Sequence, residues 1–366
     1  MSNPSNPRFP VAHGVLIEAV QDYAFPGAAY GVWMRGGVLA MEAAGRFTYE
    51  PFAHPVLPET VFDMASVSKV MATTAMAMLL WQRGQLDLDE PVCNCLPEFI
   101  KKEASDSRKR AVTPRMLLAH TSGLPAYARL FERCATAQSL LDACLHMSLE
   151  CDPGTLAVYS DIGFIVLGHL LETLAGERLD TFCQREIFVP LEMFATSYCP
   201  PQVIRPSIPP TALDDAFRHR LLQGEVHDAN CWVLGGVGGH AGVFSNVADT
   251  LRFADCILRG GESIFHAKTV SLFTTRQTEP AHTTRALGWD TPSAQSSAGQ
   301  YFSAHSAGHL GYTGTSLWID LDKDLAIVLL TNRTFPGNGA DGISKKIQQV
   351  RPLFHDALMR EMGFGK

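Results

Sequence analysis

Residues 64–84 read MASVSKVMATTAMAMLLWQRG, and this stretch decides how the rest of the chain is interpreted. Apolar residues occur almost all round the helix that it predicts, so we expect the helix to be buried and to stop at Gly84. Ser66 and Lys69 stand three residues apart at its start, a spacing that places both on one helical face. A desolvated lysine can lose its proton and act as a base toward a hydroxyl. The stretch therefore predicts a serine nucleophile beside a lysine.

The segments on either side of this helix predict an α+β fold. Helix-spaced apolar residues mark 11–24, and 28–47 reads as two strands joined by a glycine-containing turn. The pattern is mostly helical from about 64 to 250. Three segments then read as consecutive antiparallel strands, and a helix that contains Pro352 closes the chain; the strands are 286–290, 309–321 and 324–332, and the helix is 344–363. We expect an antiparallel sheet built from both chain ends and flanked by helices.

A chain of 366 residues is long enough for two domains. We expect residues 1–63 and 250–366 to form a discontinuous sheet domain, and residues 64–249 to form an inserted, mainly helical domain. Within the helical part, Thr113 and Asp249 are candidate N-caps and Gly176 a candidate helix end. The cleft between two such domains is the usual place for a small-molecule site.

Composition excludes several classes of protein. Hydrophobic residues make up 46% of the chain, charged residues 18%, and the net charge is −7, which excludes disorder, a coiled coil and collagen. No basic stripe indicates a nucleic-acid partner, and no apolar run approaches the roughly 20 residues of a membrane span. The N-terminus lacks a signal-peptide pattern, so we expect a cytoplasmic protein, or a periplasmic one if a leader has been removed. Oligomeric state is not constrained.

Neither a metal nor a cofactor is expected. The nine cysteines are odd in number and lie mostly among apolar residues, which favours reduced structural thiols; Cys93 and Cys95 have no second ligand pair nearby. Residues 236–241 formally fit a dinucleotide-binding pattern, but no acidic residue follows about 20 positions later, so a glycine-rich turn is favoured. Three further polar residues are either metal ligands or, as we favour, residues that order a loop over the cleft; they are His227, Asp228 and His240.

Two later segments complete a recognisable set of motifs. Tyr159-Ser160-Asp161 and His309-Leu310-Gly311 follow the Ser66–Lys69 pair in that order. A nucleophilic serine needs a base, a group that steers protons and paired donors for an oxyanion, and these three segments can supply all of them.

The three segments resemble the SxxK, YxN and KTG motifs of the serine β-lactamase and penicillin-binding protein superfamily, particularly class C β-lactamases, DD-carboxypeptidases and family VIII esterases. Flanking segments look alike as well, including AHTSGLP at 119–125, PGTLAVYSDIGFIVLGHLLE at 153–172 and GGHAGVFSNVADTLRFA at 238–254. The resemblance covers roughly residues 15 to 335.

The resemblance implies an acyl transfer reaction that needs no cofactor. Ser66 would attack a carbonyl, while Lys69 and Tyr159 share the proton transfers. The backbone N–H groups of Ser66 and Tyr312 would form the oxyanion hole, and water would then hydrolyse the acyl-enzyme. The substrate would contact four residues of the later motifs, namely Asp161, His309, Gly311 and Tyr312.

Two departures from the family pattern affect the chemistry. Asp161 stands where the family usually has Asn, and an anion there would favour the charged form of Lys69, so we expect Tyr159 to carry more of the base role. His309 replaces the lysine of KTG and is mostly neutral at pH 7 at its ordinary pKa. Some carboxypeptidases of the family have His at this place. Efficient penicillin hydrolysis is therefore disfavoured, and ester cleavage favoured.

Each candidate residue also has a structural interpretation. Asp161 is equally well read as a helix N-cap, and His120 is more readily a structural residue at a helix end than part of the site. Trp289 and Tyr312 either line the pocket or pack the sheet. We expect a serine hydrolase that cleaves a small ester or a D-amino-acid-type amide; the alternatives are a true β-lactamase and a non-catalytic scaffold that retains the fold.

Overall fold

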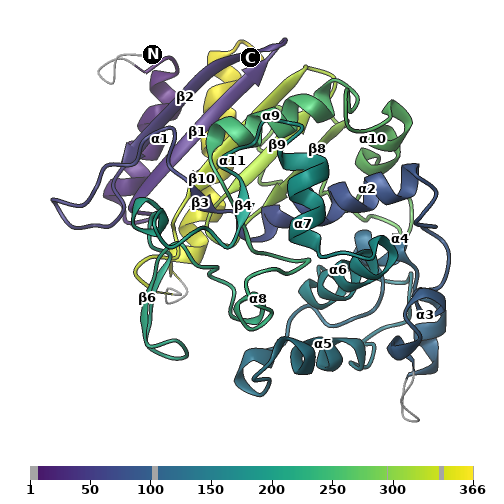
Figure 1. The fold of residues 1–366 in the computed structure, drawn as a ribbon. Helices are drawn as coiled ribbons and strands as arrows, with labels where there is room; N and C mark the ends of the chain where they lie inside the picture. The colour runs from purple at the N-terminus through teal and green to yellow at the C-terminus, as the bar shows by residue number, and fades with distance from the viewer. Residues whose placement is uncertain (1–6, 101–105, 295, 338–341, 366) are drawn as a thin grey trace.

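The computed structural model describes residues 7–100, 106–294, 296–337 and 342–365. Its centre is a five-stranded antiparallel sheet with strand order β2-β1-β10-β9-β8 (Figure 1). The strands are β1 (Gly27–Met34), β2 (Gly37–Gly45), β8 (Ser306–Leu310), β9 (Ser316–Asp320) and β10 (Leu325–Thr331). Because the N-terminal hairpin pairs with β10, with Tyr30 opposite Leu329, the expected sheet from both chain ends is confirmed.

Helices cover both faces of this sheet. Helices α1 (Pro10–Gln21) and α11 (Gly342–Glu361) pack against each other on one face, where Leu16 and Phe354 are fully buried in a shared core. Helix α9 (Val247–Leu258) covers the other face and contacts β1, β9 and β10. The core on this second face continues without a break into the helical part of the chain. The predicted domain boundaries stay a prediction.

Residues 64–84 form a buried helix with an irregular start. A 3₁₀ turn (Ala65–Val67) and a π-helical turn (Lys69–Thr74) lead into α2 (Ala75–Gln82), and Gly84 follows with a φ of +72°. Helices α6 (Asp161–Ala175), α7 (Leu179–Cys183) and α10 (Ala267–Thr274) pack against it. The remaining helices are α3 (Val92–Cys95), α4 (Pro114–Leu118), α5 (Ala137–Leu145) and α8 (Ala229–Val233). Two small sheets complete the fold, namely β3 (Phe62–Asp63), β7 (Val243–Ser245) and β4 (Ser197–Tyr198), and the β5 (Ala212–Asp214) and β6 (Arg220–Leu222) hairpin.

Three expectations are corrected. Residues 309–321 are not one strand: β8 ends at Leu310, the chain turns over 311–315, and β9 returns antiparallel to it. Residues 286–290 form no strand, because their ladder pairing is limited to isolated bridges at Arg285 and Asp290. The N-cap of α9 is Asn246 rather than Asp249, whose carboxylate instead accepts the backbone N–H of Ala195.

Candidate active site

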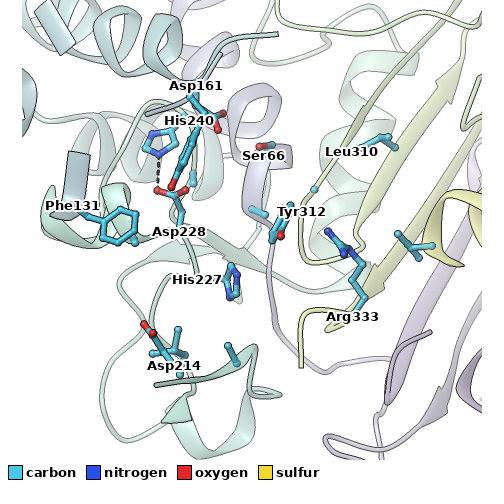
Figure 2. A pocket seen from close by; sticks show the side chains of 18 of the residues that line it. Ser66, Phe131, Asp161, Asp214, His227, Asp228, His240, Leu310, Tyr312 and Arg333 are labelled. Carbon is cyan, nitrogen blue, oxygen red and sulfur yellow. Dashed lines mark hydrogen bonds and ion pairs between the residues drawn. The ribbon is translucent and has the colours of Figure 1, made fainter. Parts of the chain in front are cut away.

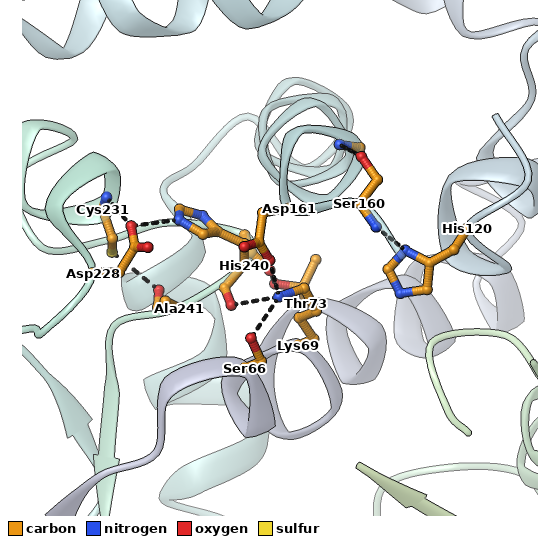
Figure 3. A network of polar contacts seen from close by, with 12 residues as sticks. Ser66, Lys69, Thr73, His120, Ser160, Asp161, Asp228, Cys231, His240 and Ala241 are labelled. Carbon is orange, nitrogen blue, oxygen red and sulfur yellow. Dashed lines mark hydrogen bonds and ion pairs between the residues drawn. The ribbon is translucent and has the colours of Figure 1, made fainter. Parts of the chain in front are cut away.

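Ser66 and Lys69 meet in the structure as the sequence spacing predicts. Lys69 is fully buried, and its Nζ lies 3.0 Å from Ser66 Oγ, 2.7 Å from Asp161 Oδ1 and 2.9 Å from the carbonyl oxygen of His240 (Figure 3). An ammonium group has three N–H donors and no acceptor, and each donor here has an acceptor. The three contacts come from different segments of the chain and together hold Lys69 in its charged form.

The pKa of Lys69 follows from two opposing effects. Burial alone lowers it, but the charge of Asp161 and the nearby hydroxyl of Tyr159 outweigh burial, so that the pKa lies above its ordinary value. The aromatic faces of Tyr159 and Phe164, with centroids 4.9 and 5.5 Å from Nζ, also favour a cation. Asp161 is therefore the ion-pair partner of Lys69.

The helix that carries Asp161 begins with a different cap from the one considered above. Ser160 is the N-cap of α6, since its Oγ accepts the backbone N–H of Gly163 at 2.9 Å. Asp161 is the first helical residue, and its carboxylate points toward Lys69 (Figure 3). The cap interpretation of Asp161 is thus wrong, and its carboxylate is left available to the lysine.

Tyr159 lies between two imidazole rings. The ring of His120 is 4.6 Å away between centroids and that of His309 is 5.9 Å away. Burial raises the pKa of Tyr159 above its ordinary value, although Lys69 and a hydrogen bond to Ser66 oppose the rise, so the phenol is protonated at neutral pH. Before substrate binds, Tyr159 is therefore neutral and the neighbouring Lys69 is charged.

His120 is closer to the site than its sequence position suggests. Its Nδ1 accepts the backbone N–H of Ser160, and its carbonyl accepts that of Val158. Burial holds the pKa of this imidazole well below its ordinary value. His120 therefore holds the backbone on either side of Tyr159. It has a structural role, and the structure that it supports is the site itself.

The turn after β8 is tied to the loop that carries Ser66. Thr313 Oγ1 donates to the carbonyl of Asp63 at 2.8 Å, and Thr315 Oγ1 donates to that of Met64 at 3.1 Å. A Cβ at Gly311 would lie 2.6 Å from the same Met64 oxygen and 1.9 Å from Thr315 Oγ1, so only glycine fits there. These contacts bring residues 311–315 against the start of the nucleophile helix.

His309 has the uncharged character that its residue type suggested. Its Nδ1 lies 2.8 Å from the carbonyl of Leu310, which can only accept, so Nδ1 carries the proton and Nε2 is an acceptor. Burial, together with the charges of Lys69 and Arg285, holds the pKa of His309 well below its ordinary value. The ring supplies no positive charge to a substrate.

These residues border one cavity of about 1000 Å³, at the upper end of the range for small-molecule sites (Figure 2). The predicted residues on its wall are Ser66, Tyr159, Asp161, His309, Gly311 and Tyr312, while Lys69 lies behind them. The side chain of Tyr312 is 52% exposed in the cavity, whereas Trp289 is buried and stacks on Phe253. The two aromatic residues therefore have different roles.

Asp228 and His240 form a pair on the same wall. His240 Nε2 lies 2.9 Å from Asp228 Oδ1, and that oxygen also accepts the backbone N–H of Cys231 at the start of α8 (Figure 3). The pair holds His240, whose carbonyl is one of the three acceptors of Lys69.

No group of three or more metal-binding side chains occurs in the described part of the chain. None of the described helices has the length and apolarity to cross a membrane.

Comparison with known proteins places this arrangement in a family. The family model described as Beta-lactamase matches residues 14–350. The chain belongs to the β-lactamase family. A putative D-alanyl-D-alanine carboxypeptidase of Salmonella agona (strain SL483) is 32% identical over 314 residues, which are 77% of this chain and 72% of that protein. The N-acetylmuramyl-L-alanine amidase of Bacillus subtilis (strain 168) is 33% identical over 355 residues, 87% and 79% of the two chains.

A solved structure supports the fold. Simvastatin synthase (LovD) from Aspergillus terreus superimposes with a TM-score of 0.74 at 21% identity, over 99% of this chain and 100% of that one. This member of the β-lactamase family is accordingly a serine hydrolase with the α+β fold expected from its sequence.

Three arginines around the cavity had no sequence signal that singled them out. Arg285 lies with its guanidinium carbon 5.4 Å from the ring centroid of Tyr159. Arg333, just after β10, stacks on the ring of Tyr312 at 4.4 Å. Arg351, on α11, donates to the carbonyls of Gly311, Gly314 and Thr315. Segments far apart in this β-lactamase-family chain supply them, so only the fold brings them to the site.

Proposed function

We propose that the protein hydrolyses a small ester or a D-amino-acid-type amide through an acyl intermediate on Ser66. The observation that carries this proposal is the hydrogen bond of 3.0 Å between Ser66 Oγ and a fully buried, charge-paired Lys69, at the wall of a cavity large enough for a substrate. Serine hydroxyls positioned beside such groups form covalent acyl intermediates in other hydrolases.

Tyr159 relays the proton in this mechanism. With Lys69 charged and Tyr159 protonated, no free base is present at rest. As Ser66 Oγ bonds to the substrate carbonyl carbon, its proton passes to Tyr159 Oη, and the phenolic proton passes to the leaving oxygen or nitrogen, whose bond to carbon breaks. Hydrolysis of the acyl-enzyme runs the same transfers in reverse, with water in place of the leaving group. Lys69 stabilises the negative charge that develops on Ser66 Oγ.

The backbone N–H groups of Ser66 and Tyr312 are the proposed oxyanion donors. The hydroxyl bonds from Thr313 and Thr315 hold the two backbone segments together before substrate binds. Preorganised donors of this kind are worth roughly 2.7–4 kcal/mol each in other enzymes.

Arg285 is a candidate for binding a carboxylate on the leaving group of the substrate. Neutral His309 cannot hold a substrate carboxylate, but the guanidinium of Arg285 is beside Tyr159 in the same cavity, and its contact with Asp290 is a long one of 3.8 Å. A cation at that place suits the free carboxylate of a D-amino acid leaving group. The names of the Salmonella and Bacillus relatives, a carboxypeptidase and an amidase, support amide substrates over penicillins.

A paired turnover assay tests the proposal on the wild type and Ser66→Ala. The substrates are a short-chain p-nitrophenyl ester, a peptide ending in D-Ala-D-Ala and a chromogenic cephalosporin. We expect turnover of the ester or the peptide to be lost in Ser66→Ala, with little cephalosporin hydrolysis in either protein. Fast cephalosporin turnover would support the true β-lactamase instead. If nothing is turned over and a fluorophosphonate does not label Ser66, the scaffold alternative holds.

A further inference from the structure

Arg333 is a buried cation that the proposed mechanism does not use. Its side chain borders the same cavity as Ser66, yet the residue is only 6% exposed, and its Nε has no hydrogen-bond partner in the described structure. The polar partner of its guanidinium is the side chain of Tyr312, and no ion pair with a carboxylate is found for it among the described residues. Burial of a charge without an anionic partner is costly unless something compensates it.

Three carboxylates of the cavity wall are already paired. Asp161 pairs with Lys69, Asp214 with Arg218, and Asp228 with His240. The carboxylates nearest the nucleophile therefore have cations of their own and are not available to Arg333.

A second buried arginine increases the local positive charge. Arg351 is 5% exposed, and its hydrogen bonds go to the uncharged carbonyls of Gly311, Gly314 and Thr315. Burial, and then the charge of Arg333, lowers the pKa of Arg351 to about 9. An anion bound at Arg333 would offset the like charges of the two arginines.

The position of Arg333 indicates which part of a substrate it faces. Its backbone N–H donates to the carbonyl of Thr313, and its guanidinium stacks on the ring of Tyr312, the residue whose backbone N–H is the proposed oxyanion donor (Figure 2). The leaving group of the substrate lies toward Tyr159, which protonates it. The acyl chain, bonded to the same carbon, would then extend away from Tyr159 into the cavity that Tyr312 and Arg333 also line.

We propose that Arg333 forms a subsite for a carboxylate on the acyl part of the substrate, so that the enzyme prefers acidic acyl groups such as glutaryl or acidic peptidyl groups. This inference rests on the proposed function, because it assumes acyl transfer to Ser66. A guanidinium presents paired N–H donors that match a carboxylate, and Arg333 lines the cavity.

Two esters of equal chain length test the subsite. Mono-p-nitrophenyl glutarate carries a terminal carboxylate, and p-nitrophenyl valerate has a methyl group at the same position; the spontaneous hydrolysis of each is subtracted. We expect kcat/KM of the wild type to favour glutarate by roughly 10- to 100-fold, the effect of a hydrogen bond to a charged group. In Arg333→Gln the ratio should fall toward one, and in Arg333→Lys part of it should return.

The matched control is Arg129→Gln. It removes the same charge from the rim of the cavity, where the guanidinium is 62% exposed and paired with Glu132, so the ratio should persist. A second measurement uses the wild type alone, in case Arg333→Gln does not fold: glutarate should inhibit valerate hydrolysis competitively, and the uncharged glutaramide should not.

The outcomes separate the two proposals. A wild-type ratio near one with Ser66-dependent turnover of both esters, or a ratio that survives in Arg333→Gln, would refute the subsite while leaving the serine hydrolase intact. Absence of Ser66-dependent turnover with either ester and with the peptide ending in D-Ala-D-Ala, together with no labelling of Ser66 by a fluorophosphonate, would instead refute the proposed function.

Discussion

Tyr159→Phe is the substitution that most directly tests the proton relay. It removes one hydroxyl and keeps the ring that packs against His120 and His309 at 4.6 and 5.9 Å. The loss of one hydrogen bond should cost about 1 kcal/mol of folding stability. Loss of a positioned proton donor and acceptor should lower kcat by roughly 10²- to 10⁴-fold. The measurements are pre-steady-state and steady-state hydrolysis of a p-nitrophenyl ester, with the free energy of unfolding from urea denaturation.

The control for this substitution is Tyr127→Phe, which removes a hydroxyl from a 45% exposed side chain on the same cavity wall. Tyr127→Phe should change kcat by less than about threefold, because the Tyr127 hydroxyl has no role in the proposed proton relay. A loss of less than tenfold in Tyr159→Phe would refute the relay, because Lys69 would then have to be the base. A loss of more than about 3 kcal/mol in unfolding free energy would assign the effect to structure instead.

Two further substitutions make use of buried charges. Asp161→Asn removes the anion that keeps the pKa of Lys69 above its ordinary value, so the basic limb of the kcat/KM profile should move to lower pH; an unchanged profile would contradict charged Lys69 in the active enzyme. His355, buried on α11 with its pKa lowered to about 4, stays neutral in the folded protein while the unfolded chain gains a proton below about pH 6.5. Stability from this residue is therefore full above pH 6.5 and falls by about 1.4 kcal/mol per pH unit down to pH 4, roughly 3 kcal/mol in all. Urea denaturation across that range should show a shallower fall in His355→Gln, and the fall should be unchanged in the exposed His54→Gln.

The sequence predicted the elements that local patterns determine. The all-round apolar residues of 64–84 gave a buried helix, and three ordered motifs placed Ser66, Lys69, Tyr159 and Asp161 together, as the contacts of Lys69 show. The apolar pattern and each motif lie within a single segment, where the periodicity and spacing of side chains predict the local structure. The roles of the individual residues in catalysis stay predictions until they are measured.

The turn at 311–315 shows where such patterns fail. The run from His309 to Leu321 alternates well enough to resemble one strand, but Gly314 adopts a φ of +99° and Gly311 donates its N–H to the carbonyl of Thr315 across a tight turn. What fixes this turn is the close approach of Met64, which comes from a segment some 250 residues away in sequence. No local signal could have shown it.

The replacement of Asn by Asp at position 161 illustrates how one residue changes the chemistry that the whole site can perform. A neutral amide would leave the buried Lys69 with a strong tendency to lose its proton, and lysine would then be the natural base. The carboxylate instead completes a set of three acceptors from Ser66, Asp161 and the carbonyl of His240. An ammonium with three hydrogen bonds cannot accept a proton, so a proton from Ser66 must go elsewhere. Tyr159 is the titratable group beside both Ser66 and Lys69, which is why the relay follows from the charge of Asp161.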